Sequence, residues 1–374
     1  MSYSSDPADY KEEDLFKVAE LHFINRMTHD AIGIRLNIRP RAKVVAMCEA
    51  ARRSGVVQIA VRPSRTTDSG RLRDLAAQVR ERFNLLDCIV VHGRSDMLNS
   101  PLPDNIREVI MDDICREAAR QLDRRFSELT EPFLAVTYGY VTRKIADYVR
   151  PQYGVNRNGN VLAAQGVRML EVDRFDANNI VRDIARQFGA KYACMPIPAL
   201  IDTKDINVVS HLPLVNTLLK ALETKSNIVV GSLATHHQTE WKQRFDSLQN
   251  ELMQTEERER YMNALLQMGA VGNIGGWWFD DKGESIEAPE RSVVGLGLKR
   301  IKQLTKARRP VIIAVGADLT RIPALAVALN PLNPLCNVWI GDEVTARVLL
   351  GEYDITASVE WLPVEQDILL TLRS

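Results

Sequence analysis

The first part of the chain shows apolar residues at helical spacing in two consecutive segments. In DLFKVAELHFINR, residues 14–26, Leu15, Val18 and their neighbours fall mostly along one stripe, as in an amphipathic helix. The next segment, THDAIGIRL, residues 28–36, opens with Thr28, whose hydroxyl suits an N-cap position. We therefore predict two helices separated by a short connection.

A turn, a third helix and a strand are predicted to follow. Pro40 suits the first position of the new helix, where its missing N–H costs nothing, and Gly55 suits the left-handed position after the last turn. Residues 56–63, VVQIAVRP, are β-branched and alternating, as in an edge strand or the wing of a winged helix. Helices and strand in this order form a winged helix-turn-helix pattern, a fold that docks on DNA. A merely structural helical cap is the alternative.

The charge distribution supports DNA binding by this segment. Residues 21–65 carry nine Lys and Arg against two acids, a net charge of +7, although the whole chain is neutral. The rest of the chain holds 39 bases and 46 acids, a net charge of −7. A compact basic segment on an acidic body is typical of a polyanion-binding module attached to another domain.

Beyond residue 70, apolar runs alternate with helical segments. Helical stretches at 71–84 and 105–126 flank the run LDCIVVHG, residues 86–93. Later apolar runs are PFLAVTYG, NVLAAQGV, KYACMPIPALI, SNIVVGSLA and RPVIIAVGA. Such alternation predicts an α/β fold with a mostly parallel sheet. We place the N-terminal winged helix-turn-helix domain at residues 1–64 and the α/β domain at residues 65–374.

The ends of these strands are the candidate ligand-binding positions. Ligands of open α/β sheets bind at the carboxyl ends of the strands, and glycines there let the backbone approach a ligand closely. The candidate loops are Thr137-Tyr138-Gly139, Ala164-Gln165-Gly166, Gly231-Ser232 and Gly316-Ala317-Asp318. For each glycine taken alone, ordinary turn geometry is the alternative.

Residues 236–266 form a long and highly charged segment of helical pattern. Its apolar positions Trp241, Phe245, Leu248 and Leu252 fall on one narrow stripe. A helix packed on the α/β domain is the favoured interpretation, and a helical pair used for self-association is the alternative.

Other features exclude several classes of protein. No apolar run reaches the roughly 18 residues of a membrane span, and the N-terminus is polar and acidic, so we expect a cytosolic protein. The five cysteines are scattered without a C-x-x-C pair, which argues against a disulfide framework or a zinc site. His236 and His237 are adjacent but have no Cys or carboxylate at ligand spacing, so a solvated loop pair is predicted there.

Several motifs in fixed order resemble those of SorC/DeoR-type sugar-sensing bacterial transcriptional regulators. The clearest is MGAVGNIGGWWFDDKGE, residues 268–284. Further similar segments are RSVVGLGL, GDEVTARVLL, MPIPALIDT, NNIVRDIARQFGA and, near the N-terminus, LNI followed by AARRSGVVQI. The resemblance covers roughly residues 15–353.

The resemblance implies a helix-turn-helix joined to an effector domain similar to glucosamine-6-phosphate deaminase and ribose-5-phosphate isomerase. Such proteins form dimers or tetramers, and a sugar or phosphosugar effector changes their affinity for an operator. The positions implied for effector binding are Thr137, Tyr138, Gly139, Tyr140, Gln165, Asp176, Gly231, Ser232, Asp280 and Arg321.

The chain departs from the family pattern in the loops that would meet a phosphate. Val141 stands where the family has a hydroxyl, with Thr142 one position later, and Gln165 stands where some members have Arg. Gln in place of Arg removes a fixed charge and a bidentate phosphate fork. A neutral polyol or another small polar ligand therefore competes with a sugar phosphate as the expected effector.

The predicted function is a ligand-responsive, DNA-binding regulator that is not an enzyme and needs no cofactor or metal. Its expected partners are an operator in double-stranded DNA, a carbohydrate effector and further copies of the chain, without a membrane. The DNA contacts are assigned to Thr28, Arg39, Arg41, Lys43 and Arg52, with the Arg39–Lys43 end dominating the reading face. Of Val44 and Val45, one is expected to face the core.

Two other functions remain open at this point. An isomerase-like or deaminase-like enzyme of the same fold needs an acid/base cluster, for which Asp176, Asp280 and Asp318 are the candidates. Hydrogen-bonding and turn roles are the simpler interpretation of these three. A regulator-like interaction protein that has lost DNA binding is the other alternative, because the recognition segment is altered.

Overall fold

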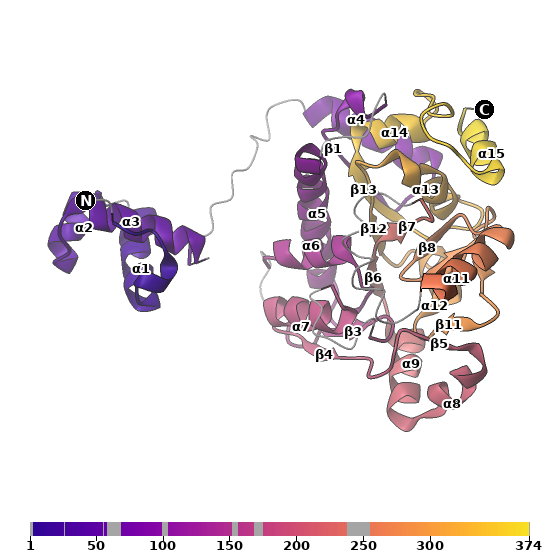
Figure 1. The fold of residues 1–374 in the computed structure, drawn as a ribbon, viewed down its shortest axis with the longest axis horizontal. Helices are drawn as coiled ribbons and strands as arrows, with labels where there is room; N and C mark the ends of the chain where they lie inside the picture. The colour runs from indigo at the N-terminus through magenta and orange to yellow at the C-terminus, as the bar shows by residue number, and fades with distance from the viewer. Residues whose placement is uncertain are drawn as a thin grey trace. The chain divides into compact units, whose positions relative to one another are not determined.

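The chain forms two compact units, Met1–Thr67 and Asp68–Ser374 (Figure 1). The computed structural model describes residues 3–25, 27–54, 56–57, 69–98, 104–151, 156–167, 175–237 and 255–373. The predicted wing strand and Gly55 lie outside these residues, apart from residues 56–57. Each unit is built around its own hydrophobic core.

The first unit is a group of short helices packed on one core. Its elements are η1 (Pro7–Asp9), α1 (Glu12–Ala19), the π-helix η2 (Glu20–Ile24), α2 (His29–Leu36) and α3 (Arg41–Arg53). Thr28 caps α2 as predicted, because its Oγ1 accepts a hydrogen bond from the Ala31 N–H at 3.3 Å. Val44 is fully buried and Val45 is half-buried, so one valine faces the core as expected.

The turn between α2 and α3 departs from the prediction by one residue. Pro40 is the N-cap of α3 and not its first residue, because the Pro40 carbonyl already accepts the first helical hydrogen bond, from Lys43 N–H. Asn37 ends α2 in the left-handed conformation, with φ 53°. Gly33 lets the turn fold close to α2, since a Cβ there would lie 2.8 Å from the Ile38 carbonyl oxygen.

The second unit is built on a seven-stranded parallel sheet, as the alternating pattern predicts. Its strands are β1 (Asp87–Val91), β2 (Phe133–Val136), β3 (Asn160–Ala163), β4 (Lys191–Ala193), β6 (Ile228–Gly231), β12 (Val311–Ala314) and β13 (Val338–Asp342). Their order is β1-β13-β12-β6-β2-β3-β4, and every pair is parallel. The central strands are buried on both faces, which explains their continuous apolar sequences.

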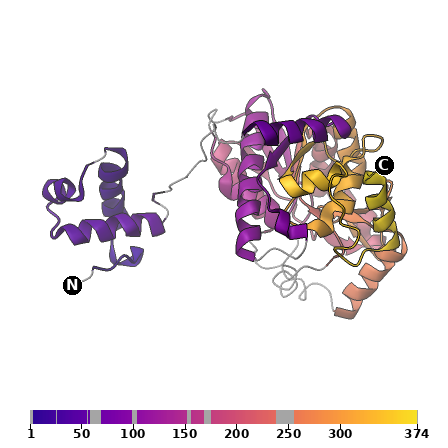
Figure 2. The same ribbon diagram turned by 90° about the horizontal axis from the view of Figure 1, so that it is seen from above.

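Helices cover both faces of this sheet. The helices of this unit include α4 (Ser69–Arg82), α5 (Asp104–Ser127), α6 (Tyr140–Tyr148), α7 (Ala177–Phe188), α8 (Ile206–His211), α9 (Pro213–Lys225), α12 (Gly297–Lys306), α13 (Ile322–Leu329), α14 (Glu343–Leu349) and α15 (Pro363–Leu372). Figure 1 shows α5, α6 and α7 on one side of the strands and α12 and α13 on the other. Figure 2 shows the same helices from above. Right-handed crossovers require this division, because the chain crosses the sheet in opposite directions in its two halves.

The strand order creates a switch point between β2 and β6. From β2 the chain proceeds through β3 to β4, whereas from β6 it proceeds through β12 to β13. The loops that leave the carboxyl ends of β2 and β6 therefore diverge to opposite faces. In open α/β sheets, ligands bind at this position.

Two smaller sheets extend the unit. One pairs β5 (Leu200–Asp202) with β11 (Arg291–Val293), and the other contains β7 (Leu233–Ala234), β8 (Gly272–Ile274), β9 (Trp277–Phe279) and β10 (Ser285–Ile286). The run KYACMPIPALI, predicted as one strand, is divided between β4 and β5.

Part of the predicted charged helix is described. Helix α11 (Thr255–Gln267) packs Leu265 on Trp278 and Ile286 of the small antiparallel sheet, so this part is a helix packed on the domain, as favoured. The stripe from Trp241 to Leu252 falls on residues 238–254, outside the described residues. No helix in the described part of the chain is long and apolar enough to cross a membrane.

Candidate functional site

The loops after β2 and β6 meet at the switch point. The Thr137 N–H donates to the Val230 carbonyl at 3.1 Å. A Cβ on Gly139 would lie 3.1 Å from Ser232 Oγ, and one on Gly231 would lie 3.3 Å from Thr137 Oγ1. Glycine at both positions thus allows the two loops to touch, and the structure brings these predicted effector residues together.

The Gly275–Gly276 turn of the β8–β9 hairpin packs on the same loops. Both glycines are left-handed, with φ +61° and +89°, where other residues pay a steric cost. A Cβ on Gly275 would lie 2.8 Å from Thr137 Cγ2, and one on Gly276 would lie 3.0 Å from the Tyr138 hydroxyl oxygen. The two glycines of the motif NIGGWW therefore let the hairpin turn pack on Thr137 and Tyr138. The spacing of the motif in the sequence does not show this contact.

Gln165 lies at the carboxyl end of the neighbouring strand β3 and is fully buried. Its backbone pairs with Gly295, where a Cβ would lie 2.9 Å from both Gln165 Cα and Trp277 Cζ2. Neither the oxygen nor the nitrogen of its side-chain amide hydrogen-bonds to any described residue. A buried polar group left without a partner costs about 1–3 kcal/mol, so such a group calls for a functional explanation.

Arg321, which follows β12 in the chain, lies beside the loop after β6. It ends the short helix η5 (Leu319–Arg321), donates from Nη1 to the Leu233 carbonyl at 3.3 Å and pairs through Nε with Asp318 at 3.3 Å. We call these residues the switch-point site. Its members are Thr137, Tyr138, Gly139, Gln165, Gly231, Ser232, Gly275, Gly276 and Arg321.

Asp342, at the end of β13, holds the loop that leads to Arg321. Its fully buried carboxylate accepts hydrogen bonds from the backbone N–H groups of Ala317 at 2.7 Å and Val344 at 2.9 Å, and from Thr345 Oγ1 at 2.7 Å. Sequence reasoning missed this role, although an Asp directly before a helical pattern is an N-cap signal.

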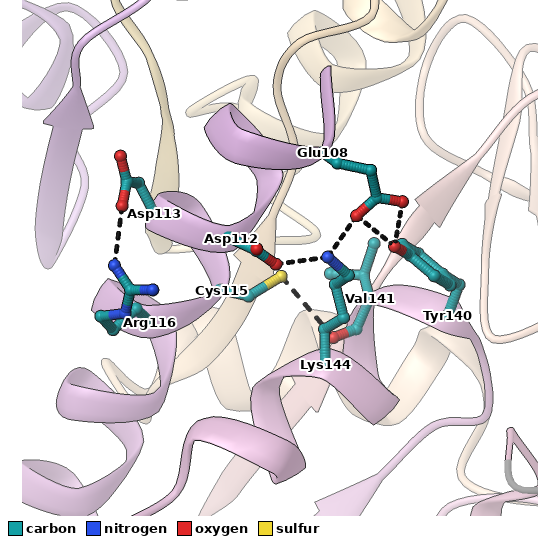
Figure 3. A network of polar contacts seen from close by, with 8 residues as sticks. All are labelled: Glu108, Asp112, Asp113, Cys115, Arg116, Tyr140, Val141 and Lys144. Atoms are coloured by element: carbon teal, nitrogen blue, oxygen red, sulfur yellow. Dashed lines mark hydrogen bonds and ion pairs between the residues drawn. The ribbon is translucent and has the colours of Figure 1, made fainter. Parts of the chain in front are cut away.

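Tyr140 does not direct its hydroxyl at the switch-point site. Figure 3 shows it pointing instead at Glu108 of α5, and the hydroxyl donates to the Glu108 carboxylate oxygens at 2.6 and 2.8 Å. Lys144 of α6 bridges Glu108 and Asp112 in the same network. The hydrogen bond to Glu108 explains why this predicted effector residue is committed to packing α6 against α5.

The network shifts the pKa values of its members. Burial, followed by the hydrogen bond to Glu108, raises the pKa of the Tyr140 phenol. Burial by itself would lower the pKa of Lys144, but its hydrogen bonds with Asp112 and Glu108 outweigh this and raise it. The lysine therefore remains charged and the phenol remains neutral over the usual pH range.

Two predicted carboxylates have structural roles. Asp176 caps α7 and accepts a hydrogen bond from the Asn178 N–H at 2.8 Å, close to the loop because Gly139 N–H donates to the Phe175 carbonyl. Asp280 does not join the site. Its Oδ1 accepts from the N–H groups of Lys282 and Glu284, at the end of β9 remote from the Gly275–Gly276 turn.

The predicted DNA contacts at and around α3 separate into two groups. Arg39, which precedes α3, and Arg41, its first residue, are exposed. Arg41 lies 3.6 Å from Asp30 in the first turn of α2, and Lys43, two residues further on, is half-buried. Arg52 lies near the other end of the helix, with its guanidinium over the Phe23 ring at 5.2 Å. Arg52 is eleven positions after Arg41, a rise of roughly 16 Å along the helix, so the structure does not bring Arg52 into the first group.

His236 and His237 differ from the predicted solvated pair. Both side chains are largely buried, at 13% and 12% exposure, against the fully buried Glu365 of α15. His237 Nε2 donates to the Glu365 carboxylate at 2.9 Å, and Leu362 N–H donates to it at 3.0 Å. Glu365 is 128 residues after His237 in the chain, so a search of the sequence near the two histidines does not find this carboxylate.

Comparison with known proteins identifies the class. Residues 68–351 match the family model described as "Putative sugar-binding domain", and the chain belongs to this sugar-binding family. The family predicted from the sequence motifs is thereby confirmed. No curated protein matches the chain.

Solved structures show the same fold. The full-length sorbitol operon regulator SorC from Klebsiella pneumoniae superposes with a TM-score of 0.62 at 17% identity, covering 91% of this chain and 99% of that one. A DeoR family transcriptional regulator from Listeria monocytogenes has a TM-score of 0.59 at 19% identity, covering 74% and 99%. A SorC family regulator from Enterococcus faecalis gives 0.52 at 21% identity, covering 73% and 98%. The first of these matches extends into the N-terminal unit, because it covers more of the chain than the second unit does.

Proposed function

We propose that the protein is a DNA-binding transcriptional regulator whose switch-point site binds a neutral, polyhydroxylated effector, a sugar or a polyol. Membership of a sugar-binding family and the fold shared with SorC/DeoR regulators support this function. Effector binding would shift the population between two arrangements of the protein that differ in affinity for DNA.

The side chain of Gln165 carries the assignment of the effector site. It is buried at the end of β3, and its amide offers one acceptor and two donor hydrogens that no described residue uses. A hydroxyl group donates and accepts hydrogen bonds, so a polyhydroxylated ligand satisfies both halves of the amide.

Charge favours a neutral ligand over a phosphorylated one. The Arg321 guanidinium already pairs with Asp318, and Lys144 pairs with Glu108 and Asp112. Arg143 of α6 likewise pairs with Asp147 and Asp183, both at 2.7 Å. Among the described residues near the site, these cations have carboxylate partners, and a phosphate would compete with them.

A thermal-shift comparison of neutral sugars, polyols and sugar phosphates tests the proposal, because a ligand raises the stability of the state that binds it. Gln165→Met should abolish the shift produced by the binding compound, and the unliganded variant should be more stable by about 1 kcal/mol because the unpaired amide is gone. Gln366→Met, at an exposed position of α15, should keep the wild-type shift. A ligand shift that survives Gln165→Met would contradict this site, and shifts by sugar phosphates alone would contradict the neutral ligand.

DNA binding is assigned to the start of α3. Arg39, Arg41 and Lys43 extend from the first turn and the residue preceding its cap, where recognition helices contact DNA. Arg41→Ala should weaken binding to duplex DNA. It should also reduce the slope of log K against log salt concentration by about 1, the value for one lost phosphate contact. Arg186→Ala, an exposed change on α7, is the charge-matched control. Equal salt slopes for wild type and Arg41→Ala would contradict the assignment of this contact. Failure of the wild-type protein to bind duplex DNA would favour a protein that has lost DNA binding.

A regulatory function accounts for the acidic residues better than an isomerase or deaminase does. Asp176, Asp280 and Asp318 each accept backbone N–H hydrogen bonds at a helix cap or a turn. We expect a homodimer or homotetramer, which would present two recognition helices to a pseudo-palindromic site. Light scattering of the full chain tests the assembly, and a turnover assay with aldose and ketose phosphates tests the enzyme alternative.

A further inference from the structure

Three potential metal ligands gather between the helices of the N-terminal unit. His22 lies in the π-helix η2, His29 is the first residue of α2, and Cys48 lies in the middle of α3. One ligand atom of each lies within 4.8 Å of the others. The scattered cysteines argue against a zinc site by their spacing, but the fold places one of them beside two histidines.

The hydrogen bond of His22 prepares its ring for a metal. Its Nδ1 lies 3.2 Å from the Met27 carbonyl oxygen, and because a carbonyl only accepts, Nδ1 carries the proton. The neutral ring then presents the lone pair of Nε2. Histidines that bind metals usually donate their other N–H to a carbonyl or carboxylate in this way.

The ring of His29 lies next to that of His22. The His22 and His29 rings stack with centroids 4.3 Å apart and an interplanar angle of 28°. Both histidines are half-buried, and the Cys48 side chain is 5% exposed beneath them. Zinc bonds of about 2.0–2.1 Å to nitrogen and 2.3 Å to sulfur place ligand atoms roughly 3.5 Å apart. Metal binding would therefore require the two partly exposed rings to rotate so that their nitrogen atoms approach one another.

We propose that His22, His29 and Cys48 form a site for a thiophilic divalent cation, Zn²⁺ in the first instance, that joins η2, α2 and α3. Two imidazoles and a thiolate suit zinc and exclude magnesium and calcium, which take oxygen ligands. Binding transfers the Cys48 thiol proton to solvent, and water or a further group fills the fourth position. The site does not depend on the function proposed above.

A second group provides an internal contrast. His236, His237 and Glu365 also gather within 4.8 Å, but His237 already donates to the Glu365 carboxylate and Glu365 already caps α15. These hydrogen bonds already use the His237 nitrogen and the Glu365 carboxylate, two of the three groups that a metal would need. This second group is therefore a clamp between α15 and the segment after β7.

Titration of the full-length apo protein with Zn²⁺ and Co²⁺ tests the proposal. We expect one equivalent of Co²⁺ to give a thiolate-to-cobalt charge-transfer band, and one equivalent of Zn²⁺ to release a proton and remove that band. Cys48→Ser should eliminate the band, and His29→Gln should weaken Zn²⁺ binding at least about tenfold. His29 is partly exposed, so this variant keeps the measurement informative if Cys48→Ser does not fold.

Two controls separate this site from other metal-binding groups. Cys194→Ser, at a half-buried cysteine of the other unit, and His237→Gln should both leave the cobalt band and the stoichiometry unchanged. Loss of the band in Cys194→Ser, or unchanged Zn²⁺ affinity in His29→Gln, would overturn the assignment. Absence of a charge-transfer band in the wild-type protein would overturn it as well.

Discussion

The buried carboxylate of Asp342 accepts a hydrogen bond from the Ala317 backbone N–H at 2.7 Å and so fixes the loop between β12 and η5. Ala317 is left-handed, with φ 56°, a conformation that a non-glycine residue adopts at a cost. The same carboxylate caps α14. One charge therefore holds two backbone segments in the loop region that leads to Arg321.

Asp342→Asn should lower the stability of the second unit by about 3 kcal/mol. The amide loses the charge and turns N–H donors toward backbone N–H groups that need an acceptor. Urea unfolding followed by circular dichroism measures the loss. Asp354→Asn is the matched control, because Asp354 accepts the Thr356 N–H at 2.9 Å in an exposed turn. Asp354→Asn should lower the free energy of unfolding by less than about 1 kcal/mol. An equal loss in both variants would contradict the claim that burial makes the Asp342 carboxylate important.

Gly275→Ala should destabilise the protein more than Gly269→Ala does. Both glycines are left-handed, with φ +61° and +83°, so each alanine pays about 1–2 kcal/mol of backbone strain. Only at Gly275 does the new Cβ also meet a neighbour, Thr137 Cγ2 at 2.8 Å, whereas nothing lies within 4 Å at Gly269. The excess, about 1–3 kcal/mol, is the cost of overpacking. Calorimetry checks the difference, and a similar loss in both variants would show that the hairpin turn does not rest on Thr137.

Stability should fall as the pH rises above about 10, and Tyr140→Phe should make the fall shallower. The raised pKa of Tyr140 means that the folded protein keeps a proton that the unfolded chain releases near pH 10. Lys144 acts in the same direction, because its raised pKa contributes stability that is complete below about pH 10 and lost as the folded group titrates. Urea midpoints between pH 8 and pH 11 give the slope. Tyr192→Phe, at an exposed tyrosine, should keep the wild-type slope, and an unaltered slope in Tyr140→Phe would refute this account.

Gly33→Ala should destabilise the N-terminal unit, although alanine is the better helix former by about 1 kcal/mol. The new Cβ would lie 2.8 Å from the Ile38 carbonyl oxygen, so the turn must move away from α2. Faster hydrogen exchange of the α2 and α3 amides, with unchanged exchange in the β-sheet of the other unit, is the expected result. Slower exchange would show that helix propensity outweighs the contact.

The architecture of the second unit follows from its sequence because each buried parallel strand is a short apolar run with helical patterns around it. The strand-end loops at Thr137 and Gly231 are predictable for the same reason. Their meeting is not, because it depends on β6 pairing with β2 across roughly ninety residues. Strand order is a property of the whole sheet, and local periodicity does not contain it.

Individual polar side chains were harder to assign than the loops that carry them. Asp280 follows a strand, as a ligand-binding carboxylate would, but it serves its own turn. Tyr140 lies beside the site in sequence, yet its hydroxyl bonds to Glu108, 32 residues earlier. In both cases the deciding partner is a hydrogen-bond donor or acceptor whose proximity only the folded chain determines. The assignment of Gln165 to the effector stays a prediction.

The hairpin that carries Gly275 and Gly276 also carries Trp277, whose indole N–H donates to the Val293 carbonyl at 3.3 Å. Its ring lies beside Gly275 and beside Gly295, which pairs with Gln165. All tryptophans of the chain lie beyond residue 240, so the N-terminal unit contributes no indole emission. Trp277 is therefore an intrinsic fluorophore that lies beside the switch-point site. Changes in that emission would follow occupancy of the site in the unlabelled protein, even while the other unit is bound to DNA.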